Sequence, residues 1–151
     1  DPNARGVFFG IGISSEKTHF IKAIMEGVSF ALRHNVETVE DLGICIDEIR
    51  FLGGGSKSPV WLHTFAKILN KPIKTLNVSD AGLLGSIMLC AKALGVYASM
   101  EKAVNTIVMT DKEIHYTAPQ PVYEKQYQLF LELYENLQPS FQKAARRNNN
   151  R

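Results

Sequence analysis

The sequence predicts an α/β fold in which a sheet that contains parallel strands is flanked by helices. Three observations predict it: long segments with helical spacing of apolar residues, two short apolar runs between them, and glycine or proline at most junctions. The order helix, strand, loop, helix, strand, helix is typical of parallel strands joined by helical crossovers. A chain of 151 residues with 45% apolar residues fits one globular domain.

The first helix is expected to begin after Ser14 or Ser15, either of which can act as its N-cap. Gly43 ends the helix in the usual left-handed position. Gly27 lies mid-helix, where it costs about 1 kcal/mol relative to Ala, and close approach of another backbone would compensate. Apolar residues recur with a helical period, which predicts a largely buried helix: Phe20, Ile21, Ile24, Met25, Val28, Ala31, Leu32, Val36 and Val39. The apolar run 6–11 before it predicts a strand or a buried turn.

Two strands follow, with a helix between them. Residues 49–52 are predicted to form the first strand, and residues 73–78 the second. Ser58 is the expected N-cap of the intervening helix, with Pro59 at its first position, where a missing N–H costs nothing. Asn70 is expected to close that helix, followed by Pro72.

A third helix is expected after Ser79 or Asp80, with Gly95 at its end. Its apolar residues are Leu83, Leu84, Ile87, Met88, Ala91 and Leu94. A short helix at 99–105 and a short strand or extended segment at 106–109 come next.

The last predicted helix is amphipathic, starts at Pro119 or Pro121, and ends before Pro139. An aromatic stripe lies along one face, and packing in the core is the favoured interpretation, with docking of a partner protein as the alternative. The stripe consists of Tyr123, Tyr127, Phe130, Tyr134 and Leu137.

The net charge of +2 arises from the C-terminal residues. Four of the 17 Lys and Arg residues lie in 143–151, which hold no acid, so residues 1–142 carry 13 cations against 15 acids. A slightly acidic body argues against a nucleic-acid surface. We expect one domain over residues 1–142 and a disordered basic tail over 143–151.

The remaining composition excludes other classes of protein. Cys45 and Cys90 lie in apolar surroundings without CxxC spacing, which predicts buried free thiols in a reducing compartment. The four histidines lack paired metal-ligand spacing, so no metal site is expected. No apolar run approaches the roughly 18 to 20 residues that cross a bilayer. Because the chain has neither an initiating Met nor a signal peptide, we expect it to be part of a longer cytoplasmic protein.

The most informative stretch is the glycine-rich loop 53–59 between the first strand and the second helix. Consecutive glycines let a ligand approach the backbone, and a helix start offers free N–H groups to a phosphate. A purely structural tight turn is the alternative interpretation. Two known phosphate-binding patterns do not fit, because Ser56 and Ser58 stand where a P-loop and a dinucleotide fingerprint respectively require glycine.

Four motifs in order resemble the FGGY family of carbohydrate kinases, xylulokinases in particular. Residues 1–10 (DPNARGVFFG) are similar to the family's DPxARGxFxG segment, and residues 23–32 (AIMEGVSFAL) to its AxxEGxxxxL helix. Residues 53–61 (GGGSKSPVW) are similar to its GGGAKSPxW adenosine loop, and residues 81–86 (AGLLGS) to its AxALGAA helix. The resemblance covers residues 1 to about 95, and the later helices match only in general pattern.

The resemblance implies an actin-like ATPase (ribonuclease H-like) lobe, the second of two, with ATP and a sugar bound between the lobes. It implies that Gly53, Gly54, Gly55 and Ser56 lie against the nucleotide and that Ser58 helps to position it. It also implies Mg²⁺ and a catalytic Asp upstream of this segment, within the first lobe or at its junction, so no catalytic or metal-binding residue is assigned to this segment. Residues Gly82 and Gly85 would let the third helix pack close to the nucleotide side of the sheet.

The expected reaction is transfer of the γ-phosphoryl group of ATP to a sugar hydroxyl, with a ketopentose such as xylulose as the first candidate substrate. Gluconate, ribulose and autoinducer-type substrates stay open, and so does a homodimer. The segment alone is expected to be inactive. The alternatives are a non-catalytic nucleotide-binding or regulatory module of the same fold, and a protein-interaction domain that uses the Tyr-rich helix.

Overall fold

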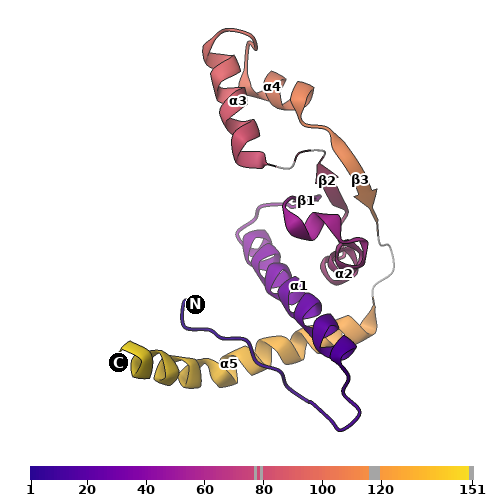
Figure 1. Ribbon diagram of the computed structural model, residues 1–151, viewed down its shortest axis with the longest axis vertical. Coiled ribbons are helices and arrows are strands. Elements are labelled where there is room, and N and C mark those ends of the chain that lie inside the picture. The colour runs from indigo at the N-terminus through magenta and orange to yellow at the C-terminus, as the bar shows by residue number, and fades with distance from the viewer. Residues whose placement is uncertain (77, 79, 116–119, 150–151) are drawn as a thin grey trace.

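The computed structural model describes residues 1–76, 78, 80–115 and 120–149, the last three of these by their backbone alone. Its elements in chain order are α1 (Lys17–Asp41), β1 (Ile49–Phe51), the 3-10 turn η1 (Gly54–Lys57), α2 (Pro59–Leu69), β2 (Ile73–Leu76), α3 (Ala81–Ala93), α4 (Met100–Ile107), β3 (Thr110–Ile114) and α5 (Pro121–Asn149). Figure 1 shows α1, α2 and the sheet in the middle, α5 crossing one end of α1, and α3 with α4 projecting at the opposite end.

The three described strands form one sheet in the order β1–β2–β3. Strand β1 pairs with β2 in parallel, with Ile49 opposite Ile73, which confirms the predicted parallel pair. Strand β3 pairs with β2 antiparallel, with Ile114 opposite Ile73. The extended segment expected at 106–109 is wrong in position, because the helix capped by Ser99 continues to Ile107 and the strand begins at Thr110.

The core lies where α1 and α2 meet the sheet. Side chains of α2 are buried on both sides of the helix, because α1 and β2 cover one side and α5 covers the other. One cluster consists of Val36, Leu62, Phe65, Ala66, Leu69 and Ile73, and a second of Phe30, Ile68 and Tyr127. The core interpretation of the aromatic stripe is confirmed at Tyr127, which is 1% exposed and therefore not available to a partner.

The ends of α2 form as the sequence predicts. Ser58 Oγ accepts a hydrogen bond from the backbone N–H of Trp61 at 3.3 Å, and Pro59 occupies the first turn. Asn70 ends the helix in the left-handed conformation, with φ 49°. Gly43 likewise follows α1 with φ 84°, and Asp80 rather than Ser79, which lies outside the described residues, caps α3 through Leu83 N.

Several expectations for α1 and the N-terminal segment are wrong. Ser15 Oγ accepts from Gly12 N at 3.0 Å, so the N-cap of α1 is Glu16, whose backbone N–H donates to His19 Nδ1 at 2.9 Å. The run 6–11 is neither a strand nor buried. Only three residues of α1 are buried, and nothing lies within 4 Å of a Cβ added to Gly27. The covering surface assumed for this helix is not among the described residues.

Other corrections concern the C-terminal half and the thiols. Helix α5 runs through Pro139 to Asn149, so it does not end before the proline. Cys45 and Cys90 are free, as expected, but both are exposed. Among the helices that the structure describes, none has the length and apolarity needed to cross a membrane.

Candidate functional site

The glycine-rich loop follows the C-terminal end of β1 and leads directly into α2. Ligands of open α/β sheets bind beyond the carboxyl ends of parallel strands, which is where this loop lies. Gly53 has φ 84° and ψ −164°, a conformation open to glycine almost alone. The backbone then forms the 3-10 turn η1 and enters α2 through Ser58.

The two serines of the loop are engaged with the loop's own backbone. Ser56 Oγ donates to the carbonyl of Gly53 at 2.7 Å, and Ser56 N donates to the same oxygen at 3.2 Å. Ser58 N donates to the carbonyl of Gly55 at 3.2 Å, while Ser58 Oγ caps α2. These bonds fix the shape of the turn, so we assign both serines a local structural role in this structure.

The three glycines differ in their surroundings. A Cβ added to Gly53 or to Gly54 would meet nothing within 4 Å. A Cβ added to Gly55 would instead rest against the rings of Phe51 and Trp61, at 3.4 and 3.5 Å. The loop therefore has an open side at Gly53 and Gly54 and a covered side at Gly55. The open backbone fits a nucleotide, because a flat or charged ligand can reach it without contact with a side chain.

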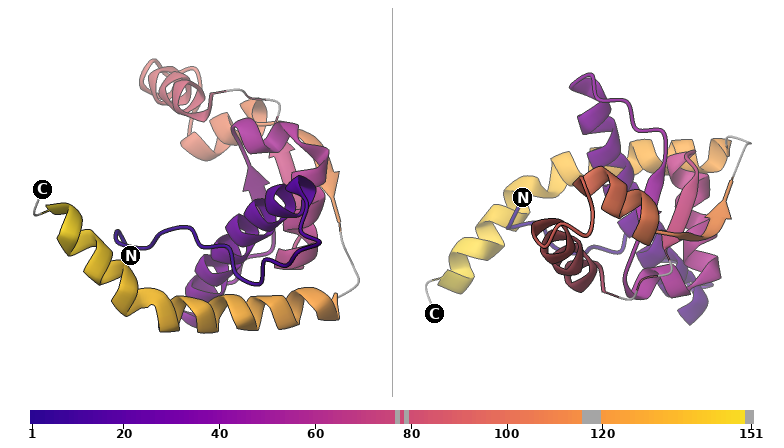
Figure 2. Two further views of the ribbon diagram at one scale, coloured as in Figure 1. Left: turned by 60° about the horizontal axis from the view of Figure 1, so that its bottom comes forward. Right: turned by 90° about the horizontal axis from the view of Figure 1, so that it is seen from above.

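The predicted role of α3 beside this loop is not observed. Gly82 has only Asp80 Oδ1 within 4 Å of an added Cβ, and Gly85 has nothing. Helix α3 packs on α4 and projects away from the sheet (Figures 1 and 2). These two glycines are therefore not brought to the candidate site by the described part of the chain.

The described residues offer the site no obvious acid–base group or metal ligand set. Among them, no three His, Cys, Asp or Glu side chains gather where they could hold a metal ion. Asp80, which follows β2 at the same edge of the sheet, is engaged as the cap of α3, with Leu83 N donating to its Oδ1 at 2.9 Å. No step of a reaction is assigned to a metal or to an acid of this segment.

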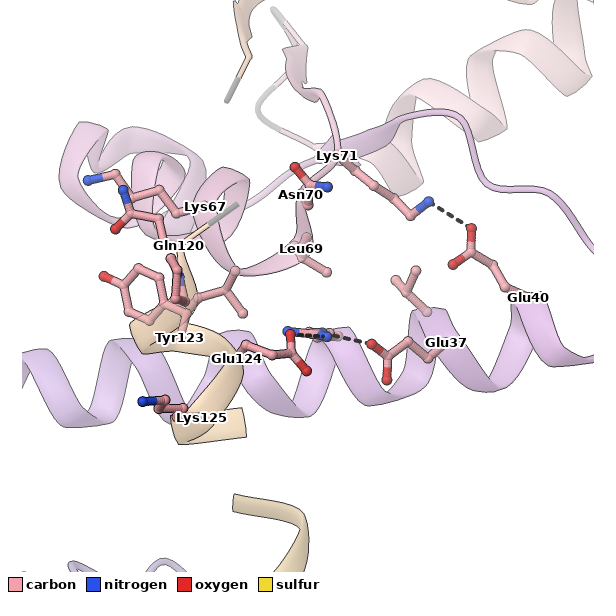
Figure 3. A pocket seen from close by; sticks show the side chains of 14 residues that line it. Glu37, Glu40, Lys67, Leu69, Asn70, Lys71, Gln120, Tyr123, Glu124 and Lys125 are labelled. Carbon is pink, nitrogen blue, oxygen red and sulfur yellow. Dashed lines mark hydrogen bonds and ion pairs between the residues drawn. The ribbon is translucent and has the colours of Figure 1, made fainter. Parts of the chain in front are cut away.

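A cavity lies elsewhere, between α1, the C-terminal end of α2 and the start of α5. It has a volume of about 630 Å³ and is lined by both charged and apolar side chains. Figure 3 shows Lys71 directed at Glu40, with a distance of 2.7 Å between Nζ and Oε1. By the helical rise, 11 residues of α2 place it about 16 Å from the glycine loop. The cavity is therefore separate from the predicted nucleotide site.

Ion pairs and a hydrogen bond beside this cavity connect α5 to α1, and we call this contact the joint between α1 and α5. Arg33 forms ion pairs with Glu37 at 2.7 Å and with Glu124 at 2.8 Å, and its guanidinium lies 4.0 Å from the centre of the Tyr127 ring. The Tyr127 hydroxyl donates to Glu37. The pKa of Tyr127 is raised above its usual value, mainly because the phenol is buried and secondly because it donates this hydrogen bond to a carboxylate. The hydrogen bond from Arg33 lowers the pKa of Glu124.

Sequence reasoning did not identify this joint. The i,i+4 spacing of Arg33 and Glu37 could have indicated an ion pair on α1. No local signal, however, connects Glu37 with Tyr127, which lies 90 residues away in the chain.

Comparison with known proteins places the chain in a family. Residues 1–94 match the sequence model of the FGGY family of carbohydrate kinases, C-terminal domain. The xylulose kinase of Bacillus subtilis is 28% identical over 137 residues, which are 91% of this chain and 27% of that protein. The crystal structure of xylulose kinase from Rhodospirillum rubrum has a TM-score of 0.78 at 30% identity, and covers 94% of this chain and 29% of that one. The crystal structure of gluconate kinase from Lactobacillus acidophilus has a TM-score of 0.82 at 28% identity, and covers 95% of this chain and 29% of that one.

The chain thus spans less than a third of the length of these relatives. The solved neighbours are sugar kinases of the actin-like ATPase fold, which confirms the predicted α/β class and lobe. The match of residues 1–94 covers all four predicted motifs, including the glycine-rich loop. This chain belongs to the FGGY family of carbohydrate kinases, and residues 1–94 match the C-terminal domain of that family.

Proposed function

We propose that this chain is the part of an ATP-dependent sugar kinase that holds the adenosine side of ATP. The observation that carries the proposal is the open side of the glycine-rich loop, where Gly53 and Gly54 expose bare backbone beyond the end of β1. The N-terminus of α2, immediately after the loop, adds the partial positive charge of a helix start. Together they suit a nucleotide with its phosphates.

The proposed binding residues are Gly53, Gly54, Gly55, Ser56 and Ser58. In this assignment the residues have different tasks. Gly53 and Gly54 would contact the ligand with their backbone, because no other group lies within 4 Å of a Cβ added to either. Gly55, Ser56 and Ser58 would hold the turn in shape through their packing and hydrogen bonds.

The complete reaction requires more of the polypeptide than this chain provides. In the proposal, the full-length kinase transfers the γ-phosphoryl group of ATP to a sugar hydroxyl in the cytoplasm, with Mg²⁺ and with a catalytic Asp that lies upstream of this segment, within the first lobe or at its junction. Xylulose is the first candidate substrate, because relatives named xylulose kinase match over most of the chain. Gluconate is the second, because a gluconate kinase is equally similar in structure.

The first test measures binding and turnover of the 151-residue chain separately. We expect isothermal titration to show weak binding of ATP and ADP and no binding of a sugar, because the proposal assigns the sugar contacts mainly to the other lobe. Incubation with ATP, Mg²⁺ and xylulose, ribulose, gluconate or glycerol should yield no phosphorylated sugar. Phosphorylation of any of these by the chain alone would contradict the proposal. In the full-length kinase, the same panel identifies the substrate, and no turnover with any sugar would favour a non-catalytic module.

The second test places side chains on the loop. Gly54→Val should weaken ATP binding about tenfold, which corresponds to about 1.4 kcal/mol, because its side chain fills the open side of the loop. Gly12→Val is the matched control, since nothing lies within 4 Å of a Cβ added there either. In the full-length kinase the KM for ATP should rise while the KM for the sugar stays constant. An equal rise in both would count against the assignment.

A further inference from the structure

The covered side of the glycine-rich loop rests on the rings of Phe51 and Trp61, and both of these pack on the ring of Phe65; we call the three rings the aromatic floor. The rings of Trp61 and Phe65 are stacked, with centroids 5.6 Å apart and an interplanar angle of 15°. The ring of Phe51 lies 4.3 Å from that of Phe65. Because Phe65 is 2% exposed and belongs to the main core cluster, the floor is anchored in the packed core.

Trp61 holds the loop at two points. Its ring lies beneath Gly55, where an added Cβ would meet Cε3 at 3.5 Å and Cζ3 at 3.6 Å. Its backbone N–H donates to Ser58 Oγ, at the end of the same turn. One residue thus connects the glycine turn, the first turn of α2 and, through Phe65, the main core. Trp61 therefore supports the turn relative to the sheet, together with Phe51, whose ring also lies against Gly55.

The ring itself, rather than the polar atom of the indole, explains this arrangement. Trp61 Nε1 is buried and has no hydrogen-bond partner among the described residues. A buried donor without a partner disfavours folding, so the indole is not held there by its N–H. What remains is a broad flat surface that fills the space between Phe65 and Gly55.

We propose that Trp61 is a positioning residue for the nucleotide: its ring keeps the η1 turn in the conformation that presents Gly53 and Gly54 to the ligand. The inference rests on the proposed function and adds to it a residue that does not itself contact ATP. A loop that is held in its binding conformation before the ligand arrives loses less entropy on binding. Loss of the ring should therefore weaken nucleotide binding without changing the sugar site.

The test compares Trp61→Leu, Trp61→Phe and the control Val60→Ala, whose side chain is exposed on the adjacent position of α2. Trp61→Leu should weaken ATP binding about tenfold, and Trp61→Phe, which keeps an aromatic ring, only about two- to threefold. Hydrogen exchange of the amides of residues 54–58 should accelerate in Trp61→Leu, while that of β2 stays slow. In the full-length kinase, the KM for ATP should rise while kcat and the KM for the sugar remain unchanged.

A second pair of variants tests the same idea without disturbing the core. Gly54→Ala places a methyl group on the open side of the loop, whereas Gly55→Ala places it against the aromatic floor at ordinary contact distance. We expect Gly54→Ala to weaken ATP binding more than Gly55→Ala. If Trp61→Leu does not fold, this pair tests the positioning role instead. Equal weakening of ATP binding by Gly54→Ala and Gly55→Ala would then overturn the inference.

The outcomes separate this inference from the proposed function. If the unaltered chain and the full-length kinase do not bind ATP, the proposed function fails. If they bind ATP and Trp61→Leu binds it equally well, only the positioning role of Trp61 is overturned. Equal weakening by Val60→Ala would also overturn it.

Discussion

Two regions of the molecule are similarly apolar in sequence but differ in how they are packed. Helix α2 has five buried residues, covered by α1, the sheet and α5. Helix α3 is apolar around its whole circumference, yet none of residues 81–93 is buried. Leu83 and Leu89 are 61% and 62% exposed. A helix that is apolar on all sides is normally enclosed, so α3 lacks the surface that would cover it.

The difference shows which part of the fold this chain can stabilise with its own contacts. Burial of apolar area is the main favourable term in folding, and α1, α2, α5 and the sheet obtain it from one another. Helices α3 and α4 obtain little of it. The chain spans less than a third of its relatives, so we expect the remaining polypeptide of a full-length kinase to cover α3.

The largest effect on stability is expected in the packed region. Phe65→Ala should lower the free energy of unfolding by about 3–5 kcal/mol, because it opens a cavity where Phe51, Trp61 and the core meet. Leu89→Ala on α3 is the matched control and should change it by less than about 0.5 kcal/mol. Urea unfolding followed by circular dichroism measures both. Comparable losses would show that α3 is packed in solution.

An intermediate effect is expected at the joint between α1 and α5. Tyr127→Phe removes the hydrogen bond to Glu37 and should cost about 1–2 kcal/mol at pH 7. The loss depends on pH, because the folded state raises the pKa of Tyr127 above the usual value near 10. Above about pH 10 the unfolded chain releases this proton while the folded chain retains it, so the stability that Tyr127 provides decreases as the pH rises.

The pH dependence has its own measurement. The difference in urea midpoint between the unaltered chain and Tyr127→Phe should be constant from about pH 7 to 9 and should shrink between about pH 10 and 11. Tyr134→Phe is the control, since that hydroxyl donates to Asp1 near the chain terminus rather than to the buried joint. A difference that stays constant throughout this range would contradict the role of the buried phenol.

The smallest effect on stability is expected on α3. Leu83→Lys combined with Leu89→Lys should change the unfolding free energy by less than about 0.5 kcal/mol, since both side chains already face solvent. The same variant should reduce self-association of the 151-residue chain in sedimentation experiments, because exposed apolar patches promote association. A decrease of several kcal/mol in the free energy of unfolding, or unchanged self-association, would contradict the conclusion that α3 is exposed while α2 is packed.

Much of the fold could be predicted where a signal is local. Ser58 with Pro59, Asp80 before α3 and Gly43 after α1 all act at the predicted ends, because capping depends on residues within one turn. The parallel pairing of β1 and β2 also follows from the order of elements. The predicted start of α1 is wrong because Ser15 is engaged by Gly12. The exposure of α3 could not be predicted, because apolarity does not reveal whether a partner surface lies within the same chain.

For the candidate site, too, local features could be predicted from the sequence and contacts between distant residues could not. The position of the loop, between a strand and a helix, could be predicted from consecutive glycines and the Ser–Pro helix start. The different surroundings of the three glycines could not, because they depend on where Phe51 and Trp61 place their rings. Binding of ATP at this loop remains a prediction.

The pairing of the sheet limits how the sheet can be extended. Because β2 lies between β1 and β3, an added strand must join one of the two outer strands. Strand β3 carries Asp111, Lys112 and Glu113, all exposed, and charged side chains at an edge discourage further pairing. Strand β1 has Ile49 and Phe51 instead. Any additional strands of a full-length kinase are therefore expected to join at β1, so that the glycine-rich loop would lie near the middle of the enlarged sheet.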